Sequence, residues 1–191
     1  MAHGSSMVHA PKPSPTQRDL LTLPLRACVA FAARCARRVQ SLLASFDEET
    51  RAAADRVLRM AEDYAVGNDH VRKSVSEAVE GIQPKWLIVT RTSEEHALKA
   101  VNLLVRTVFF AAHTPACLSL GWKRTQDVSL TASLAAEAAK AAVTARPECA
   151  AAVWADLDLL KSAVEQGRIS ADTPVSQSFF EANTEPPSAG D

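Results

Sequence analysis

The sequence has few aromatic residues, few glycines and almost no net charge. Aromatic residues make up 5% of the 191 positions, glycine occurs six times, and the formal net charge is −1. Alanine and leucine dominate the apolar residues, and both favour helix where few β-branched runs compete. A chain without a net basic surface also lacks the usual electrostatic basis for binding nucleic acid or an anionic membrane. We therefore expect an all-α protein, and nucleic acid is disfavoured as a partner.

Long apolar runs are also absent. No stretch reaches the roughly 18 apolar residues that a membrane-spanning helix needs, and the N-terminus has no continuous hydrophobic centre of the kind found in signal peptides. The four cysteines do not suggest a small secreted disulfide scaffold in a helical chain of this size. We expect a cytoplasmic protein that has reduced thiols and no association with a membrane.

The hydrophobic residues that are present, 47% of the chain, recur mainly at helical spacing. Helices are expected at about 25–45, 48–66, from near Asn68 or Asp69 to Gly81, 92–112, 127–145 and 147–166. Residues 85–91 resemble a strand but have no partner to pair with, so we interpret them as a buried connection. Turn-forming residues predict a loop over 113–126.

These elements predict one domain of about six helices over residues 18–168. The helix at 92–112 is apolar on nearly every face, which predicts that it is the buried central element. Residues 1–17 are expected to be a disordered tail that begins with a possible expression scar, and 169–191 a flexible tail. Phe179 and Phe180 are exceptions in this second tail: they either dock on the helices or form a motif for a partner.

The stretch 25–43 combines two cysteines with a cluster of arginines. Cys28 and Cys35 fall on the apolar stripe of the expected helix, which favours a place in the core because unpaired cysteine behaves as a small hydrophobe. The arginines fall largely on the other side and are interpreted as a solvated face. Cys149 is interpreted in the same way as Cys28, and Cys117 is expected to be the most exposed thiol.

No motif with a known chemistry accompanies these residues. The sequence lacks a glycine-rich phosphate loop, a GxSxG elbow and an HExxH metal motif. We therefore predict no catalytic, cofactor-binding or metal-binding residues, and we interpret Asp156 and Asp158 as carboxylates on a helix surface. An alternative is a helical enzyme or metal-binding protein that uses His70, His96 or His113.

Two segments resemble a pattern common in planctomycete proteins, in which a "FACACCRRIW" helix precedes a helix ending "AERYADG". The first segment, "FAARCARRVQSLL", matches at Phe31, Ala32, Cys35, Arg37 and Arg38, and the second, "VLRMAEDYAVG", matches at Ala61, Glu62, Tyr64, Ala65 and Gly67. The chain departs from the pattern at Ala33, Ala36 and Gln40. A third segment, "ECAAAVWADLDLLKSAV" from Glu148 to Val164, loosely resembles the alanine-rich late helix of the same family. The resemblance covers about a third of the chain and implies an uncharacterised bacterial helical family with no assigned activity, cofactor or ligand.

The function expected from these observations is a non-enzymatic module for protein–protein interaction or self-association. It follows from a large helical surface without a recognisable catalytic motif. Besides the helical enzyme or metal-binding protein, a small subunit associated with nucleic acid is a second alternative.

Overall fold

The structure is a computed structural model that describes residues 13–68, 92–119, 124–171 and 173–181, with side chains except in 113–119 and 124–127. Every regular element in these ranges is a helix, which confirms the all-α fold class. The described helices are, in chain order, α1 Gln17–Leu20, α2 Leu25–Val39, the 3₁₀ helix η1 Gln40–Ser45, α3 Glu48–Ala65, α5 Ser93–Ser119, α6 Arg124–Ala145, the 3₁₀ helix η3 Pro147–Cys149, α7 Ala150–Glu165 and α8 Ser178–Glu181. The helix expected between Asp69 and Gly81 and the connection at 85–91 lie outside the described residues.

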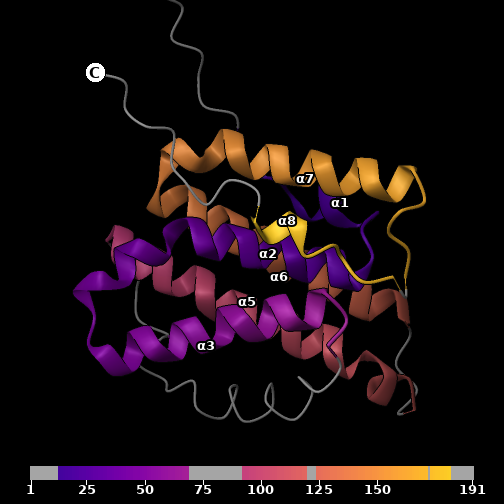
Figure 1. The fold of residues 1–191 in the computed structure, drawn as a ribbon, viewed down its shortest axis with the longest axis horizontal. Coiled ribbons are helices and arrows are strands. Elements are labelled where there is room, and N and C mark those ends of the chain that lie inside the picture. Colours follow the sequence, from indigo (N-terminus) through magenta and orange to yellow (C-terminus); the bar gives the residue numbers. More distant parts are fainter. Residues whose placement is uncertain (1–12, 69–91, 120–123, 172, 182–191) are drawn as a thin grey trace, which may run out of the picture.

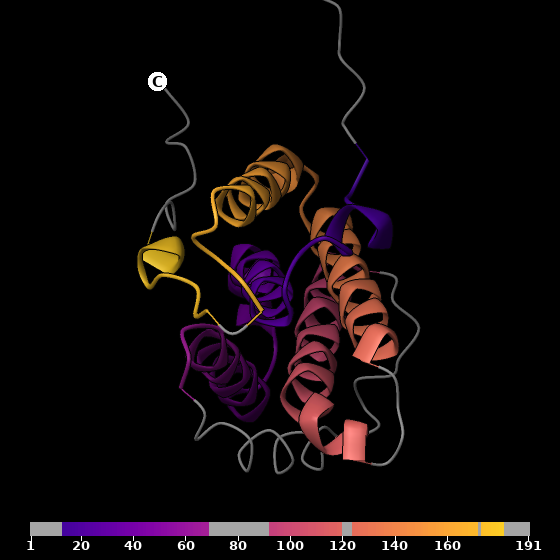
Figure 2. The ribbon, with the colours of Figure 1, turned by 90° about the vertical axis from the view of Figure 1, so that its right-hand side faces the viewer.

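Helix α2 runs through the middle of the bundle. Figure 2 shows α7 above it and α3 below it, with α5 and α6 to the right and α8 to the left. Every residue from Ala27 to Ala36 is buried, and Arg34 is among them. The expected solvated face of this helix is therefore wrong, because α7 and α8 cover the side that carries Arg34.

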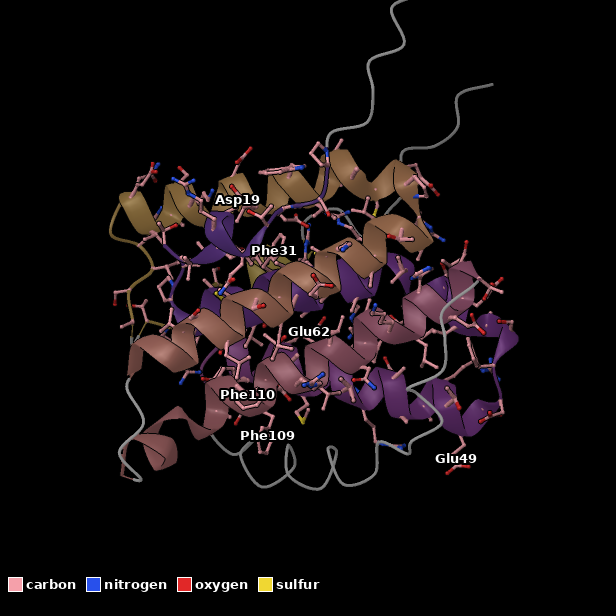
Figure 3. The ribbon with its side chains drawn as sticks, turned by 180° about the vertical axis from the view of Figure 1, so that it is seen from behind. Asp19, Phe31, Glu49, Glu62, Phe109 and Phe110 are labelled. Carbon is pink, nitrogen blue, oxygen red and sulfur yellow. The ribbon has the colours of Figure 1, made fainter. Side chains whose placement is uncertain are left out.

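Helix α5 is buried along most of its described length, as its all-round apolar pattern predicts. Val101, Leu104 and Val108 are fully buried and pack in the core with α2, α3 and α6. Phe109 and Phe110 are partly exposed and meet edge to face, with their ring centroids 5.5 Å apart (Figure 3). The core of the bundle is thus shared by α2 and α5.

Local capping signals mark the helix ends that the sequence predicts. The Asp47 side chain accepts a hydrogen bond from the Thr50 N–H at 2.8 Å and caps α3. Thr92 and Glu95 form the reciprocal pair of a capping box before α5. At the other ends, Gly67 and Gly167 have φ angles of 97° and 68°, a region that glycine enters without a steric penalty.

The predicted loop at 113–126 is wrong where the structure describes it, since α5 continues to Ser119 and α6 already begins at Arg124. The loop was expected from the turn-forming residues of this stretch, which include Pro115. A proline has no N–H to donate to the carbonyl four residues earlier, which is here that of Ala111. In the structure the Tyr64 hydroxyl of α3 donates to the Ala111 oxygen at 2.9 Å. This bond from another helix satisfies the carbonyl that the proline leaves without its usual partner.

The folded domain extends beyond its expected limits, residues 18 and 168, at both ends. Before α1, Pro15 is buried, and Gln17 donates to the backbone and side-chain oxygens of Ser129 on α6. After α7, Val175 and Phe179 are buried, so Phe179 docks on the helices. Among the described helices, none combines the length and the apolar character that crossing a membrane requires.

Candidate functional site

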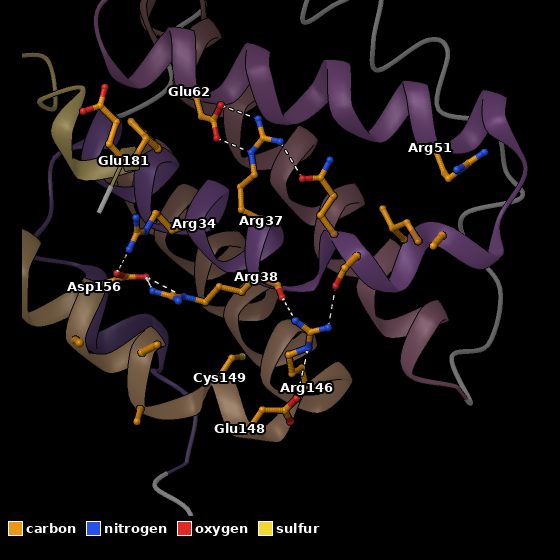
Figure 4. A pocket seen from close by; sticks show the side chains of 18 of the residues that line it. Arg34, Arg37, Arg38, Arg51, Glu62, Arg146, Glu148, Cys149, Asp156 and Glu181 are labelled. Atoms are coloured by element: carbon orange, nitrogen blue, oxygen red, sulfur yellow. Dashed lines mark hydrogen bonds and ion pairs between the residues drawn. The ribbon is translucent and has the colours of Figure 1, made fainter. Parts of the chain in front are cut away.

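A groove of about 1380 Å³ lies between α3 and α7, with α2 and η1 beneath it (Figure 4). α8 crosses it at one end, and η1 lies toward the opposite end (Figure 1). Its charged lining residues are Arg34, Arg37, Arg38, Arg51, Arg146, Glu62, Glu148, Asp156 and Glu181. The volume exceeds the several hundred Å³ of a typical small-molecule site, so the groove has room for a segment of another chain.

Asp156 joins two arginines of α2 to α7. Its Oδ1 accepts a hydrogen bond from Arg34 Nη2 at 2.8 Å, and its Oδ2 accepts from Arg38 Nη2 at 2.7 Å. The side chains of Arg34 and Asp156 are only 7% and 5% exposed. Because buried charges need close partners, this triad fixes the position of both guanidinium groups.

Arg34 also holds the C-terminal segment. Its Nη1 donates to the Phe179 carbonyl at 2.7 Å, and its guanidinium carbon lies 5.1 Å from the centroid of the Phe179 ring. The Val175 N–H donates to the Ala65 carbonyl at the end of α3 at 2.9 Å. These contacts tie the segment to α2 and α3 and position the groove wall formed by Phe180 and Glu181.

Arg37 is paired on the α3 side. Its Nε and Nη2 donate to the two carboxylate oxygens of Glu62 at 2.7 and 2.8 Å, and its Nη1 donates to Asp55 at 3.2 Å. The hydrogen bond with Glu62 is the main cause of the raised pKa of Arg37. The two-point geometry is the strong form of an arginine–carboxylate pair and sets the direction of this guanidinium.

The two remaining arginines are held differently. Arg146 Nη1 donates to the Arg38 carbonyl and Nη2 donates to Ser41 Oγ, both at 2.8 Å. Its ion pair with Glu148 is longer, 3.5 Å, and Glu148 is 74% exposed. Arg51 is 49% exposed, and its ion pair with Glu48 measures 4.0 Å. Both guanidinium groups therefore have weaker carboxylate partners than Arg34, Arg37 and Arg38.

The described cysteines carry free thiols and are buried, which confirms the predicted core position of Cys28 and Cys35. Burial raises the pKa of Cys28 to about 12 and that of Cys35 well above its ordinary value. Cys149 lines the groove, and burial raises its pKa as well. A reactive thiol has a lowered pKa, so the state of Cys149 does not favour a nucleophilic role. The side chain of Cys117 lies outside the described part of the chain.

The alternative hypothesis, a helical enzyme or metal-binding protein, requires histidines that lie close together. The described part of the structure shows no such group. His96 lies in the first turn of α5, partly buried and away from the groove lining. His70 and the side chain of His113 lie outside the described part. Within that part, no three histidine, cysteine, aspartate or glutamate side chains form a group that could hold a metal ion.

Sequence reasoning missed the groove because it interpreted Asp156 and the arginines of α2 as surface charges. The interpretation is correct for Asp158, which is exposed, and wrong for Asp156, which is 4% exposed. The sequence did contain a signal that Asp156 is buried. Asp156 follows Val153 by three residues and precedes Leu160 by four, so it shares their buried face. A carboxylate on an apolar stripe indicates a cationic partner from another helix.

Comparison of the chain with protein-family models, with curated proteins and with solved structures found no match in any of the three.

Proposed function

We propose that the protein is a non-enzymatic protein-interaction module and that the groove between α3 and α7 receives its partner. The observation that carries this proposal is the groove itself, which is large and has walls fixed by buried ion pairs. Preorganised side chains bind a partner at a lower entropic cost than mobile ones. A cytoplasmic location and membership of the planctomycete family remain part of the proposal. The free thiols support the location, and the matching residues support the family.

The chemistry of the lining supports binding rather than catalysis. The described lining residues include no histidine, and the only thiol among them, that of Cys149, has a raised pKa. Acyl and group transfer by a side-chain nucleophile usually need such a group next to a base. The carboxylates of Asp156 and Glu62 are engaged by arginines, which favours their ionised form rather than a general acid.

A site-specific photo-crosslinker tests the proposal in cells of the source organism. The probe replaces Ala155, which is exposed on the α7 wall of the groove, and in a control it replaces Glu137, which is exposed on α6. We expect one protein, identified by mass spectrometry, to be crosslinked at Ala155 and not at Glu137. A second copy of this chain as the crosslinked protein would identify self-association.

The identified partner is then purified and titrated against the parent protein and two variants. Ala155→Trp places a large side chain in the groove, and Glu137→Trp is the matched control. We expect Ala155→Trp to weaken binding at least about tenfold and Glu137→Trp to leave it unchanged. Equal crosslinking at both positions, no crosslinked protein, or binding that is insensitive to Ala155→Trp would contradict the proposal.

A further inference from the structure

The arginines of the groove divide into a structural set and an available set. Arg34, Arg37 and Arg38 are each held by a close carboxylate at 2.7–2.8 Å. Among the described residues, the carboxylates nearest to Arg51 and Arg146 form ion pairs of 4.0 and 3.5 Å and are 93% and 74% exposed. A carboxylate from a partner would therefore compete with weak, solvated contacts at the second set and with strong, buried ones at the first.

Arg146 is prepared for such a contact. Two of its guanidinium nitrogens are already anchored, on the Arg38 carbonyl and on Ser41, so its position is set before a partner arrives. The Nε atom faces Glu148, whose side chain is exposed enough to move aside. An arginine that is held in place loses less conformational entropy when it forms a new hydrogen bond.

The positive charge of the groove is concentrated toward its η1 end. Arg51 and Arg146 lie there with Glu148 (Figure 4). Toward the α8 end, Arg34 and Arg38 share Asp156, Arg37 pairs with Glu62, and Glu181 adds a further carboxylate. The excess of cationic side chains is thus small and local, which suits single carboxylates spaced along a partner segment.

A continuous polyanion fits this distribution poorly. Carboxylates from α3, η3, α7 and α8 alternate with the arginines along the groove and would repel a row of phosphates. The net charge of the whole chain is −1, so no overall positive charge of the protein offsets this repulsion.

The walls favour a peptide as the occupant. Ala151, Ala152 and Ala155 form the α7 side, where small side chains let a peptide backbone approach closely. Phe180 offers a partly buried aromatic ring at the α8 end. A segment with small or apolar residues could lie along this wall and direct its acidic side chains at the two available arginines.

We propose that the groove recognises a protein segment in which isolated acidic side chains alternate with small or apolar residues, and that Arg51 and Arg146 bind its carboxylates. The proposal rests on the function proposed above and names the chemistry of the partner. It assigns a direct contact with the ligand to Arg51 and Arg146, and a positioning role to Arg34, Arg37 and Arg38.

Fluorescence anisotropy with three labelled synthetic peptides tests it. They share an alanine, serine and leucine background and carry glutamate, glutamine or lysine at the same spaced positions. The glutamate peptide should bind at least about tenfold more tightly than the glutamine peptide, because charge-assisted hydrogen bonds are the stronger ones. Its binding should weaken as salt is added, and the lysine peptide should not bind.

Three variants identify the residues that carry the affinity. Arg51→Gln and Arg146→Gln should each weaken binding of the glutamate peptide about three- to tenfold. Arg168→Gln is the matched control, because Arg168 is exposed and does not line the groove. Arg146 also anchors η1 through Ser41, so the melting temperature of the Arg146→Gln variant is measured together with its binding. Within the described part of the chain, Arg51 is paired only with the exposed Glu48, so Arg51→Gln decides the matter if Arg146→Gln fails to fold.

Several results would overturn the proposal. One is equal binding of the glutamate and glutamine peptides, and another is a loss with Arg168→Gln as large as that with Arg51→Gln. A single-stranded oligonucleotide of similar length that binds more tightly than the glutamate peptide would assign the groove to nucleic acid. If the glutamate peptide fails while Ala155→Trp still abolishes binding of the crosslinked partner, the acidic segment is wrong and the interaction module stands. If no partner is crosslinked, the proposed function itself fails.

Discussion

Arg34 and Asp156 form an ion pair that is buried on both sides and connects α2 to α7 across 122 positions of the chain. Asp156 is shared with Arg38, so one carboxylate balances two guanidinium groups. The pair belongs to the structural part of the groove, and its removal is the most direct test of the packing of α7 on α2.

Asp156→Asn should lower the free energy of unfolding by about 3–5 kcal/mol, because it leaves two arginines close together without their counter-charge. Asp158→Asn is the matched control on the exposed side of the same helix and should change stability by less than about 0.5 kcal/mol. Chemical denaturation of both variants provides the measurement. Equal stability of the two would mean that the triad contributes nothing to the fold.

Tyr64→Phe should cost about 1–3 kcal/mol, because the Ala111 carbonyl then lies buried without the bond that replaces the missing N–H of Pro115. Pro115→Ala supplies an N–H at that position, so Tyr64→Phe should cost less in a Pro115→Ala background. Thermal and chemical unfolding of the double-mutant cycle measure the coupling. Additive effects would show that the two residues do not serve the same carbonyl.

Truncation after Arg168 should destabilise the protein, since it removes the buried side chains of Ile169, Val175 and Phe179 and one partner of Arg34. Loss of these buried apolar side chains corresponds to about 5–9 kcal/mol, or a fall in melting temperature of more than about 10 °C for a chain of this size. Truncation after Glu181 removes no described residue and is the control. An unchanged melting temperature after the longer truncation would contradict the docking of Phe179.

Leu104→Ala should cost about 2–5 kcal/mol, because Leu104 is fully buried on α5 and the smaller side chain leaves a cavity in the core. Arg56→Ala, at an exposed position of α3, should cost well under about 1 kcal/mol. Denaturant titration compares the two. If Leu104→Ala is as stable as the control, α5 is not part of the core.

The buried thiols predict how stability changes with pH. Burial raises the pKa of Cys28 from 9.0 to about 12, so the folded state keeps its proton where the unfolded state releases it. Stability from this residue is therefore complete below pH 9 and is lost as pH rises from 9 to about 12. Denaturant unfolding between pH 8 and pH 10 should show a steeper loss for the parent than for Cys28→Ala.

The same burial predicts slow chemical modification. In single-cysteine variants, Cys28 and Cys35 should react with a thiol reagent only at the rate at which the native protein opens, because both are fully buried. Rapid reaction of either thiol in native buffer would contradict the position that the structure gives it.

Helix positions were predictable from the sequence because their signals are local. Asp47, Thr92 with Glu95, Gly67 and Gly167 all act within a few residues of the helix end that they mark. The path of α5 past Pro115 was not predictable. It depends on the Tyr64 hydroxyl, which comes from 47 positions away.

The groove was unpredictable for the same physical reason. The arginine pattern of α2 is compatible with a solvated face until the helices that cover it are known. Asp156 comes from 122 positions beyond Arg34, and Phe179 from 145 positions beyond it. Spacing along one helix identifies which residues share a face, but it does not identify what packs against that face.

The contact between Arg34 and the Phe179 carbonyl has a consequence for the order in which the protein is made. During synthesis α2 emerges early, and α8 leaves the ribosome only after 145 further residues, so this end of the groove is closed late. Closing so long a loop also carries an entropic cost that earlier contacts must first offset. A nascent or prematurely terminated chain would therefore lack the Phe180 and Glu181 wall, and a partner that requires this wall would discriminate finished molecules from incomplete ones.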